Sequence, residues 1–231
     1  MAGHLTASEK QIELTITALR GGKRHVANAS SAEYGLGSHG PVVSDHFPLT
    51  KKLLARPPFA FIHAVVIEAH GITGFGGHTA LSDFELSGKF PQQSDRAGRV
   101  ALLIKLLAYI DHVIRHNDTA AGGGGAGGAS ATAAGQQRRG SVNLEWGEMW
   151  VPCVMLVSPT KLLAGKEPDR TLAMLQKLAI AARKVREDHT RAVRAAQHIK
   201  TQGAHALYNH SLRLRGILAA FQNIWRRKIS S

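Results

Sequence analysis

Apolar residues in this chain recur at steps of three and four, in segments bounded by proline and glycine. After Pro57 and Pro58, this spacing predicts a helix that ends at Gly71. Its apolar stripe consists of Phe59, Ile62, Val66 and Ala69. No segment alternates apolar and polar residues in the way that half-buried strands do. The pattern therefore predicts an all-α fold.

Three further helices are predicted from the same signals. The first covers Ser8–Leu19 with Ser8 as N-cap, and the second covers Arg99–His116. Pro168 opens the third, because proline is tolerated in the first turn of a helix. The apolar positions of the second are Val100, Leu103, Ile104, Leu107, Ile110 and Ile114, and those of the third are Leu172, Leu175, Leu178, Ala179 and Ala182. The run "EMWVPCVMLVSPTKLL" fits either a buried helix or an extended segment.

With 231 residues, the chain is long enough for one domain with appendages. A Gly/Ala-rich stretch and a polar Gly/Ser/His-rich stretch are predicted to be insertions, the former disordered, because neither can bury a core. The predicted division is a first helix (1–19), a loop insertion (20–46), a first domain part (47–116), the Gly/Ala-rich insertion (117–145), a last domain part (146–186) and a basic helical tail (187–231).

Positive charge is concentrated in the last third of the chain. From Lys161 to the end there are fifteen Lys and Arg against four Asp and Glu, a net of +11, whereas the whole chain carries +13. Such a charge exceeds what solubility needs, although a solvated helix face is the commonest fate of Lys and Arg. It favours an acidic partner: nucleic acid, anionic lipid or an acidic protein lattice.

The N-terminus lacks the pattern of a signal peptide, and the apolar runs are too short or too interrupted to span a bilayer. The chain has a single cysteine, Cys153, so no internal disulfide is possible. We therefore expect a soluble intracellular protein, with Cys153 packed in the core.

The motifs of common enzyme classes are missing or incomplete. "AGKEP" resembles part of a phosphate-binding loop, but Thr160 and Glu167 occupy positions that need Gly and Ser or Thr. "GITGFGG" follows a predicted helix, whereas a dinucleotide-binding loop follows a strand. No Gly-x-Ser-x-Gly is present. We expect no catalytic residue, no cofactor and no small-molecule substrate.

Two histidine pairs share a helical face, His63 with His70 and His112 with His116. The second pair has the spacing of metal ligands, but no His-Glu-x-x-His motif occurs and one cysteine cannot build a structural zinc site. We expect no bound metal. The terminal stripe Leu214–Trp225 is compatible both with packing on the domain and with docking to a partner helix or a membrane surface.

Two stretches resemble one known family, "PLTKKLLARPPFAFIHAVVIEAHGITGF" and "SPTKLLAGKEPDRTLAMLQKLA". The matching residues are Pro48, Leu49, Thr50, Lys52, Leu53, Leu54, Pro57, Pro58 and Phe59, then Thr73, Gly74 and Phe75, then Pro159 and 162–171. The chain is similar here to the N-terminal domain of the microtubule-interacting protein associated with TRAF, an intraflagellar-transport complex B subunit. The resemblance implies a calponin-homology-like (CH-like) helical domain that binds tubulin or microtubules and serves ciliary transport.

On this resemblance the implied partners are tubulin or microtubules and other complex B subunits. The implied locations are the cytoplasm, the cytoskeleton, the cilium or flagellum and the basal body. The electrostatic candidates for tubulin contact are Lys51, Lys52, Arg56, Lys161, Lys166, Arg170, Lys177 and Lys184. Pro57, Pro58, Phe59, Gly165 and Pro168 are assigned to holding the fold.

The chain departs from the family pattern in its two insertions and in the lack of a coiled coil. The alternative function is that of a basic helical nucleic-acid-binding protein. It is disfavoured because the chain shows no helix-turn-helix, no RNA-binding signature and no aromatic residues interleaved with the basic ones.

Overall fold

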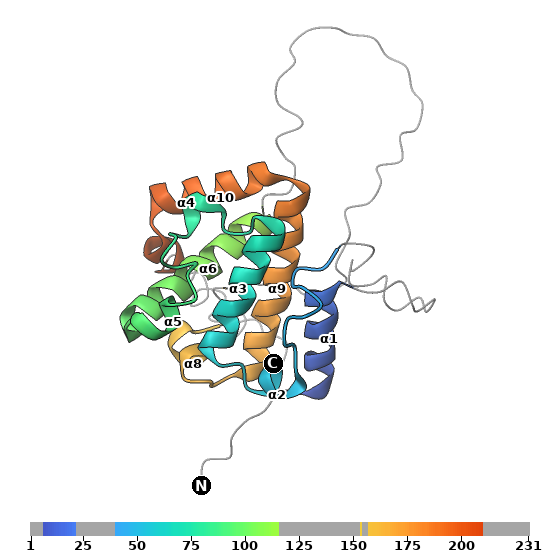
Figure 1. The fold of residues 1–231 in the computed structure, drawn as a ribbon. Coiled ribbons are helices and arrows are strands. Elements are labelled where there is room, and N and C mark those ends of the chain that lie inside the picture. The colour runs from blue at the N-terminus through green and yellow to red at the C-terminus, as the bar shows by residue number, and fades with distance from the viewer. Residues whose placement is uncertain (1–6, 22–39, 116–152, 154–156, 210–231) are drawn as a thin grey trace, which may run out of the picture.

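The computed structural model describes residues 7–21, 40–115, 153 and 157–209, and all the regular secondary structure in these ranges is helical (Figure 1). The prediction of an all-α fold is confirmed. The helices are α1 (Glu9–Arg20), α2 (Lys51–Ala55), α3 (Phe59–Thr73), α4 (Gly77–Ala80), α5 (Phe90–Gln93), α6 (Arg96–Arg115), α8 (Pro159–Leu163), α9 (Pro168–Glu187) and α10 (His189–Gln202).

Helix α9 is the central element of the fold. It packs against α1, α3, α6 and α10, and Figure 1 shows it between α3 and α1. Its predicted apolar stripe is confirmed, since Leu172, Leu175, Leu178, Ala179 and Ala182 are all buried. Arg183 is buried as well, and its guanidinium donates a hydrogen bond to the carbonyl of Ala18 in α1. Because α9 has neighbours on several sides, little of its circumference is left for solvent.

The two helices predicted from the strongest stripes, α3 and α6, both form. In α3 the whole predicted stripe is buried, but the helix continues past Gly71 to Thr73, so the predicted end was wrong by two residues. Gly71 faces open space, where a missing side chain removes no packing. The helix is ended instead by Gly74, which adopts the left-handed conformation (φ 72°) that glycine accepts readily.

Helix α1 follows the predicted signals. The Ser8 side chain accepts a hydrogen bond from the backbone N–H of Gln11, and Gly21 follows the last residue. The predicted loop insertion (20–46) overlaps the last residue of this helix, Arg20, and its own last residues are packed against α1. The backbone N–H groups of Val42 and Val43 both donate to the carbonyl of Leu19, and both valines are fully buried. This part of the loop therefore contributes to the core.

Helix α10 lies in the range that we predicted as a basic tail. Asp188 caps its start, and Ala192, Ala195, Ala196 and Ile199 are buried against α4, α6 and α9. The described chain is thus part of one core cluster at least as far as Ile199. The terminal stripe Leu214–Trp225 and the Gly/Ala-rich insertion lie outside the described residues.

Of the ambiguous run "EMWVPCVMLVSPTKLL", the structure describes Cys153 and the residues from Val157 onward. Cys153 is fully buried, as predicted, and its backbone N–H donates to Oδ1 of Asp111 in α6 at 2.6 Å. Burial, together with the nearby Asp111 carboxylate, raises the pKa of the Cys153 thiol well above its usual value. The thiol is therefore a core group and not a nucleophile.

Candidate functional site

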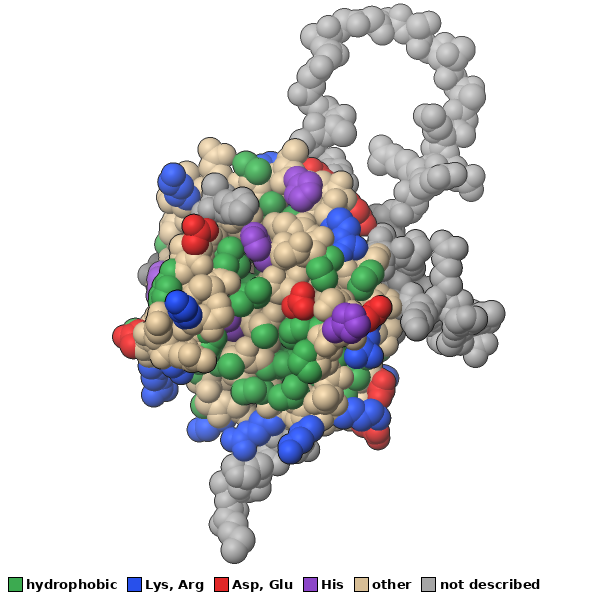
Figure 2. Space-filling model, viewed as in Figure 1, with side chains coloured by type: hydrophobic (Ala, Val, Ile, Leu, Met, Phe, Trp, Pro, Cys, Tyr) green, Lys and Arg blue, Asp and Glu red, His purple; other side chains and the backbone are tan. Residues whose placement is uncertain are grey.

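The two sequence motifs meet at one end of the molecule. The side chain of Arg56, which follows α2, lies against the α8–α9 turn, and a Cβ added at Gly165 would be 3.3 Å from its Nε. The backbone N–H of Ser8 donates to Oδ1 of Asp169 at 2.9 Å, which brings the start of α1 to the same place. We call the six cations of this region the basic end: Lys51, Lys52, Arg56, Lys161, Lys166 and Arg170. Figure 2 shows Lys and Arg side chains gathered along the edge where Figure 1 places α2.

The α8–α9 turn contains Gly165 and Pro168, two of the residues assigned to holding the fold. Gly165 has φ 63°, and Pro168 is the first residue of α9. Between them, Glu167 also adopts a left-handed conformation (φ 65°), which is unusual for a residue with a side chain. Its carboxylate accepts a hydrogen bond from Lys161 Nζ at 2.8 Å, and its carbonyl accepts from the N–H of Thr171. These bonds hold Lys161 and the first turn of α9 to Glu167.

Half of the cations in the basic end are neutralised by neighbouring carboxylates. Lys51 pairs with Glu13 at 2.9 Å and with Glu9 at 3.2 Å. Hydrogen bonds to Glu13 and then Glu9 raise the pKa of Lys51. Lys161 and Arg170 share Glu167, at 2.8 and 3.5 Å. Three cations have therefore already found acidic partners within the protein.

The other three cations of the basic end are Lys52, Arg56 and Lys166. All three have exposed side chains, and none of them has a carboxylate partner among the described residues. A cation paired with a carboxylate has little remaining effect on the electrostatic potential, because the two charges largely cancel. The positive potential of this end therefore comes mainly from Lys52, Arg56 and Lys166. The chemistry they can perform is recognition of a polyanionic surface.

The remaining two candidates, Lys177 and Lys184, lie elsewhere. They follow Arg170 at intervals of seven residues, so Lys184 is about 21 Å further along the axis of α9. Both side chains are only partly exposed, and each has an interaction of its own in the molecule. Lys177 lies close enough to the Cys153 thiol to affect its pKa. The structure thus brings six of the eight predicted residues together and separates these two from them.

The acidic partners were missed by sequence reasoning. Glu167 stands three residues before Arg170, a spacing that pairs charges on a helix and could have been recognised. Glu9 and Glu13 lie about forty residues before Lys51, and no local signal connects them. Only the packing of α1 against α2 makes that pairing possible.

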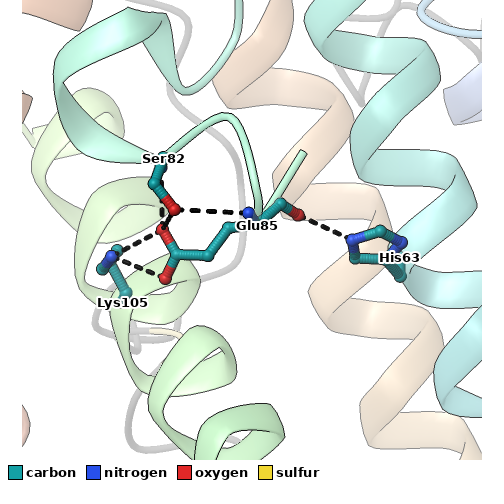
Figure 3. A network of polar contacts seen from close by, with 4 residues as sticks. All are labelled: His63, Ser82, Glu85 and Lys105. Atoms are coloured by element: carbon teal, nitrogen blue, oxygen red, sulfur yellow. Dashed lines mark hydrogen bonds and ion pairs between the residues drawn. The ribbon is translucent and has the colours of Figure 1, made fainter. Parts of the chain in front are cut away.

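A second polar group lies beside α3 and α6 (Figure 3). Nε2 of His63 donates to the carbonyl of Glu85 at 2.7 Å, and the Glu85 carboxylate binds Lys105 Nζ at 2.6 and 2.8 Å. Ser82 donates to the same carboxylate through its N–H and its hydroxyl. Burial alone would raise the pKa of Glu85, but the bonds from Lys105 and Ser82 outweigh it and lower that pKa. The network ties the 82–90 segment to both helices.

Acid should weaken this network through His63. Burial lowers the pKa of His63 from 6.5, although its bond to Glu85 opposes the shift, so the folded protein binds the proton less readily than the unfolded chain. The contribution of His63 to stability is therefore complete above pH 6.5 and is lost as the pH falls below it. We expect the urea concentration at the midpoint of unfolding to decrease when the pH is lowered from about 7 to about 5. The decrease should be smaller in His63→Gln, whose side chain keeps a hydrogen-bond donor. Equal pH dependence in the two proteins would contradict this assignment.

Four of the described histidines make polar or ring contacts with other residues of the protein. Besides His63, Nδ1 of His70 donates to the carbonyl of Phe75, and the rings of His112 and His198 stack at 4.4 Å between centroids. His116 lies outside the described residues. Among the residues that the structure describes, no three His, Cys, Asp or Glu side chains are placed to share a metal ion. No described helix is both long and apolar enough to cross a membrane.

Comparison with known proteins supports the resemblance found in the sequence. Residues 40–132 match the family model described as the microtubule-binding protein MIP-T3 CH-like domain. The chain matches no curated protein. The matched range holds the first motif and helices α2 to α6, whereas the second motif follows it and packs against it through α8 and α9. Residues 40–132 of this chain are therefore similar to the MIP-T3 family of CH-like domains.

Proposed function

We propose that this protein is a non-enzymatic module that binds microtubules or tubulin. The family that its residues 40–132 match is described as microtubule-binding. The observation that carries the proposal to this chain is the basic end, where cations from two segments about a hundred residues apart share one surface. A polyanionic filament such as the tubulin lattice, with its acidic tails, matches such a surface in charge.

Within the basic end, the proposed contacts differ in importance. Lys52, Arg56 and Lys166 lack carboxylate partners among the described residues and are proposed as the main contacts. Lys51, Lys161 and Arg170 are proposed as flanking contacts, because their own carboxylates reduce their charge. Lys177 and Lys184 were included in the predicted site, and their positions along α9 give them at most a peripheral part in it.

Co-sedimentation with taxol-stabilised microtubules tests this function directly. It is run at about 0.01 M and about 0.15 M salt, with a short duplex DNA as competitor. We expect pelleting that weakens with salt and is indifferent to the DNA. Pelleting abolished by equimolar DNA would favour the nucleic-acid-binding alternative, and absence of pelleting at both salt concentrations would exclude the proposed function.

We further propose that the protein acts in intraflagellar transport and in the assembly of the cilium or flagellum, in contact with other complex B subunits. The support is the family resemblance of both motifs. The corresponding locations are the cytoplasm, the cytoskeleton, the cilium and the basal body. A fluorescent fusion expressed in ciliated cells should accumulate in the cilium and at its base, and complex B subunits should co-purify with it. A uniform cytoplasmic signal without these subunits would contradict this role while leaving microtubule binding intact.

A further inference from the structure

The basic end has an acidic border on α1, formed by Glu9 and Glu13. These two residues are four apart in sequence, so they lie on the same side of the helix. Both carboxylates bind Lys51 Nζ of α2, at 3.2 and 2.9 Å. One lysine with two carboxylates leaves an excess of one negative charge at this point. Figure 2 shows acidic side chains beside basic ones at the edge where Figure 1 places α1.

Both glutamates of the acidic border are open to solvent. The side chain of Glu9 is 80% exposed and that of Glu13 is 54% exposed, so an approaching ligand meets both carboxylates directly. Lys10 is the cation of α1 nearest to them in sequence. It lies about 100° around the helix from Glu9 and about 60° from Glu13, and with these exposed fractions it stands beside the border without covering it.

The acidic border is held in place by the packing of α1 against α9. The backbone N–H of Ser8 donates to Oδ1 of Asp169 at 2.9 Å, which joins the starts of the two helices. Further along, the side-chain amide of Gln176 donates to Oε1 of Gln11 and to Oγ1 of Thr15, both at 3.0 Å. Because α1 is fixed in this way, an incoming ligand does not displace the border and has to accommodate its charge.

The cations of the basic end do not by themselves distinguish one polyanion from another. Lys52, Arg56 and Lys166 attract a nucleic acid and an acidic protein surface alike, and so does the net charge of +13. Lys52 directly follows Lys51, which carries the acidic border, and consecutive Cα atoms are about 3.8 Å apart. Salt screens exposed charges over about 8–10 Å. A ligand that spans both lysines therefore experiences the charge of the border as well.

We propose that Glu9 and Glu13 determine the specificity of the basic end by repelling nucleic acid while admitting an acidic protein surface, an inference that rests on the proposed microtubule binding. A DNA duplex has one negative charge per about 1.7 Å of its axis and no positive charge, so a length that covers the basic end also brings phosphates to the border. A folded protein surface carries both signs with neutral residues between them, so its carboxylates can meet the unpaired cations while another group meets the border. Repulsion of the wrong partner is a general source of specificity.

The double variant Glu9→Gln/Glu13→Gln tests this proposal, because glutamine keeps the size of the side chain and removes its charge. Its binding to a fluorescent duplex of about 20 base pairs is measured by anisotropy, and its binding to microtubules by co-sedimentation, both at about 0.05 M salt. We expect the affinity for DNA to rise about fivefold or more and the affinity for microtubules to change less than about twofold. Should the double variant be unstable, each single replacement is measured, with a smaller rise in DNA affinity expected.

The matched control is Asp45→Asn/Asp83→Asn, which makes the same change in net charge. Both aspartates are exposed, and they lie in the segments 42–49 and 82–90, away from α1 and α2. This variant should raise the affinity for DNA less than about twofold. An equal rise in the control would assign the effect to net charge, and an equal rise for DNA and microtubules would mean that the border does not select. Either result, or no rise at all, would overturn the proposal.

The salt dependence of DNA binding provides a second readout. Without its two carboxylates, Lys51 is free to contact a phosphate, so the slope of log K against log salt concentration should become steeper by about 0.9 in the Gln variant and stay unchanged in the control. A raised affinity with an unchanged slope would contradict the role given to the border. Pelleting of the unaltered protein is scored separately. Its absence would refute microtubule binding, whereas pelleting without a gain in DNA affinity in the variant would refute only this inference.

Discussion

Replacing Lys52, Arg56 and Lys166 together by glutamate is expected to weaken microtubule binding about thirtyfold at low salt. These cations have no carboxylate partner among the described residues, so each reversal removes an attraction and adds a repulsion. A loss of about 0.7 kcal/mol at each site gives about 2 kcal/mol, which corresponds to this factor. The measurement is the dissociation constant from co-sedimentation over a range of microtubule concentrations.

The control for this variant makes the same change in net charge elsewhere. Lys89, Arg96 and Lys200 are exposed and lie outside the basic end, the first beside α5, the second on α6 and the third on α10. Their replacement by glutamate should cost clearly less affinity, because the effect of an exposed charge decreases over about 10 Å at moderate salt. If both triple variants lose affinity equally, the attraction comes from overall charge and the basic end is not a site.

Phe75→Ala is expected to destabilise the fold by about 3–5 kcal/mol, the usual cost of removing a fully buried aromatic side chain. Phe75 has no exposed surface, and its ring packs edge-on against Tyr109 of α6 at 5.0 Å between centroids. Its backbone also fixes the end of α3, since its N–H donates to the Thr73 hydroxyl and its carbonyl accepts from His70. Urea unfolding followed by circular dichroism measures the change.

Phe84→Ala is the matched control for this prediction. The Phe84 side chain is 48% exposed, and its ring contacts Phe90 at 5.3 Å. Its loss should cost about 1 kcal/mol, mainly from the aromatic pair. Similar costs for the two substitutions would mean that Phe75 is less well packed than the structure indicates.

The elements that the sequence predicted well are those whose signals are local. Ser8 caps α1, Pro168 opens α9, and the apolar stripes of α3 and α9 are buried, as is that of α6 except for the partly buried Val100 and Ile114. Each of these signals acts within one or two helical turns, so no knowledge of the rest of the chain is needed. The short helices α2, α4 and α5 were not predicted, because five residues or fewer cannot show a period of 3.6.

The sequence was a poorer guide where one local signal was compatible with two structures. Gly71 and Gly74 are both possible ends of α3, and only the second takes the left-handed conformation. The basic composition after Glu187 predicted a helical tail without deciding whether it docks on the domain, and the small alanines of α10 pack into the core. In both cases the outcome depended on which neighbour occupied the space beside the residue, which the order of residues does not specify.

The sequence by itself determined that the described part of this protein is built of helices, where α1, α3 and α9 begin, and which faces of α3 and α9 are buried. Only the tertiary structure decided which cations share a surface and which carboxylates cancel them. Arg56 and Gly165 are adjacent because α2 and the α8–α9 turn pack at one end of the same core, and Lys184 is distant because a rigid helix carries it away. Helix signals are set by neighbours along the chain, whereas an electrostatic surface is set by neighbours in space.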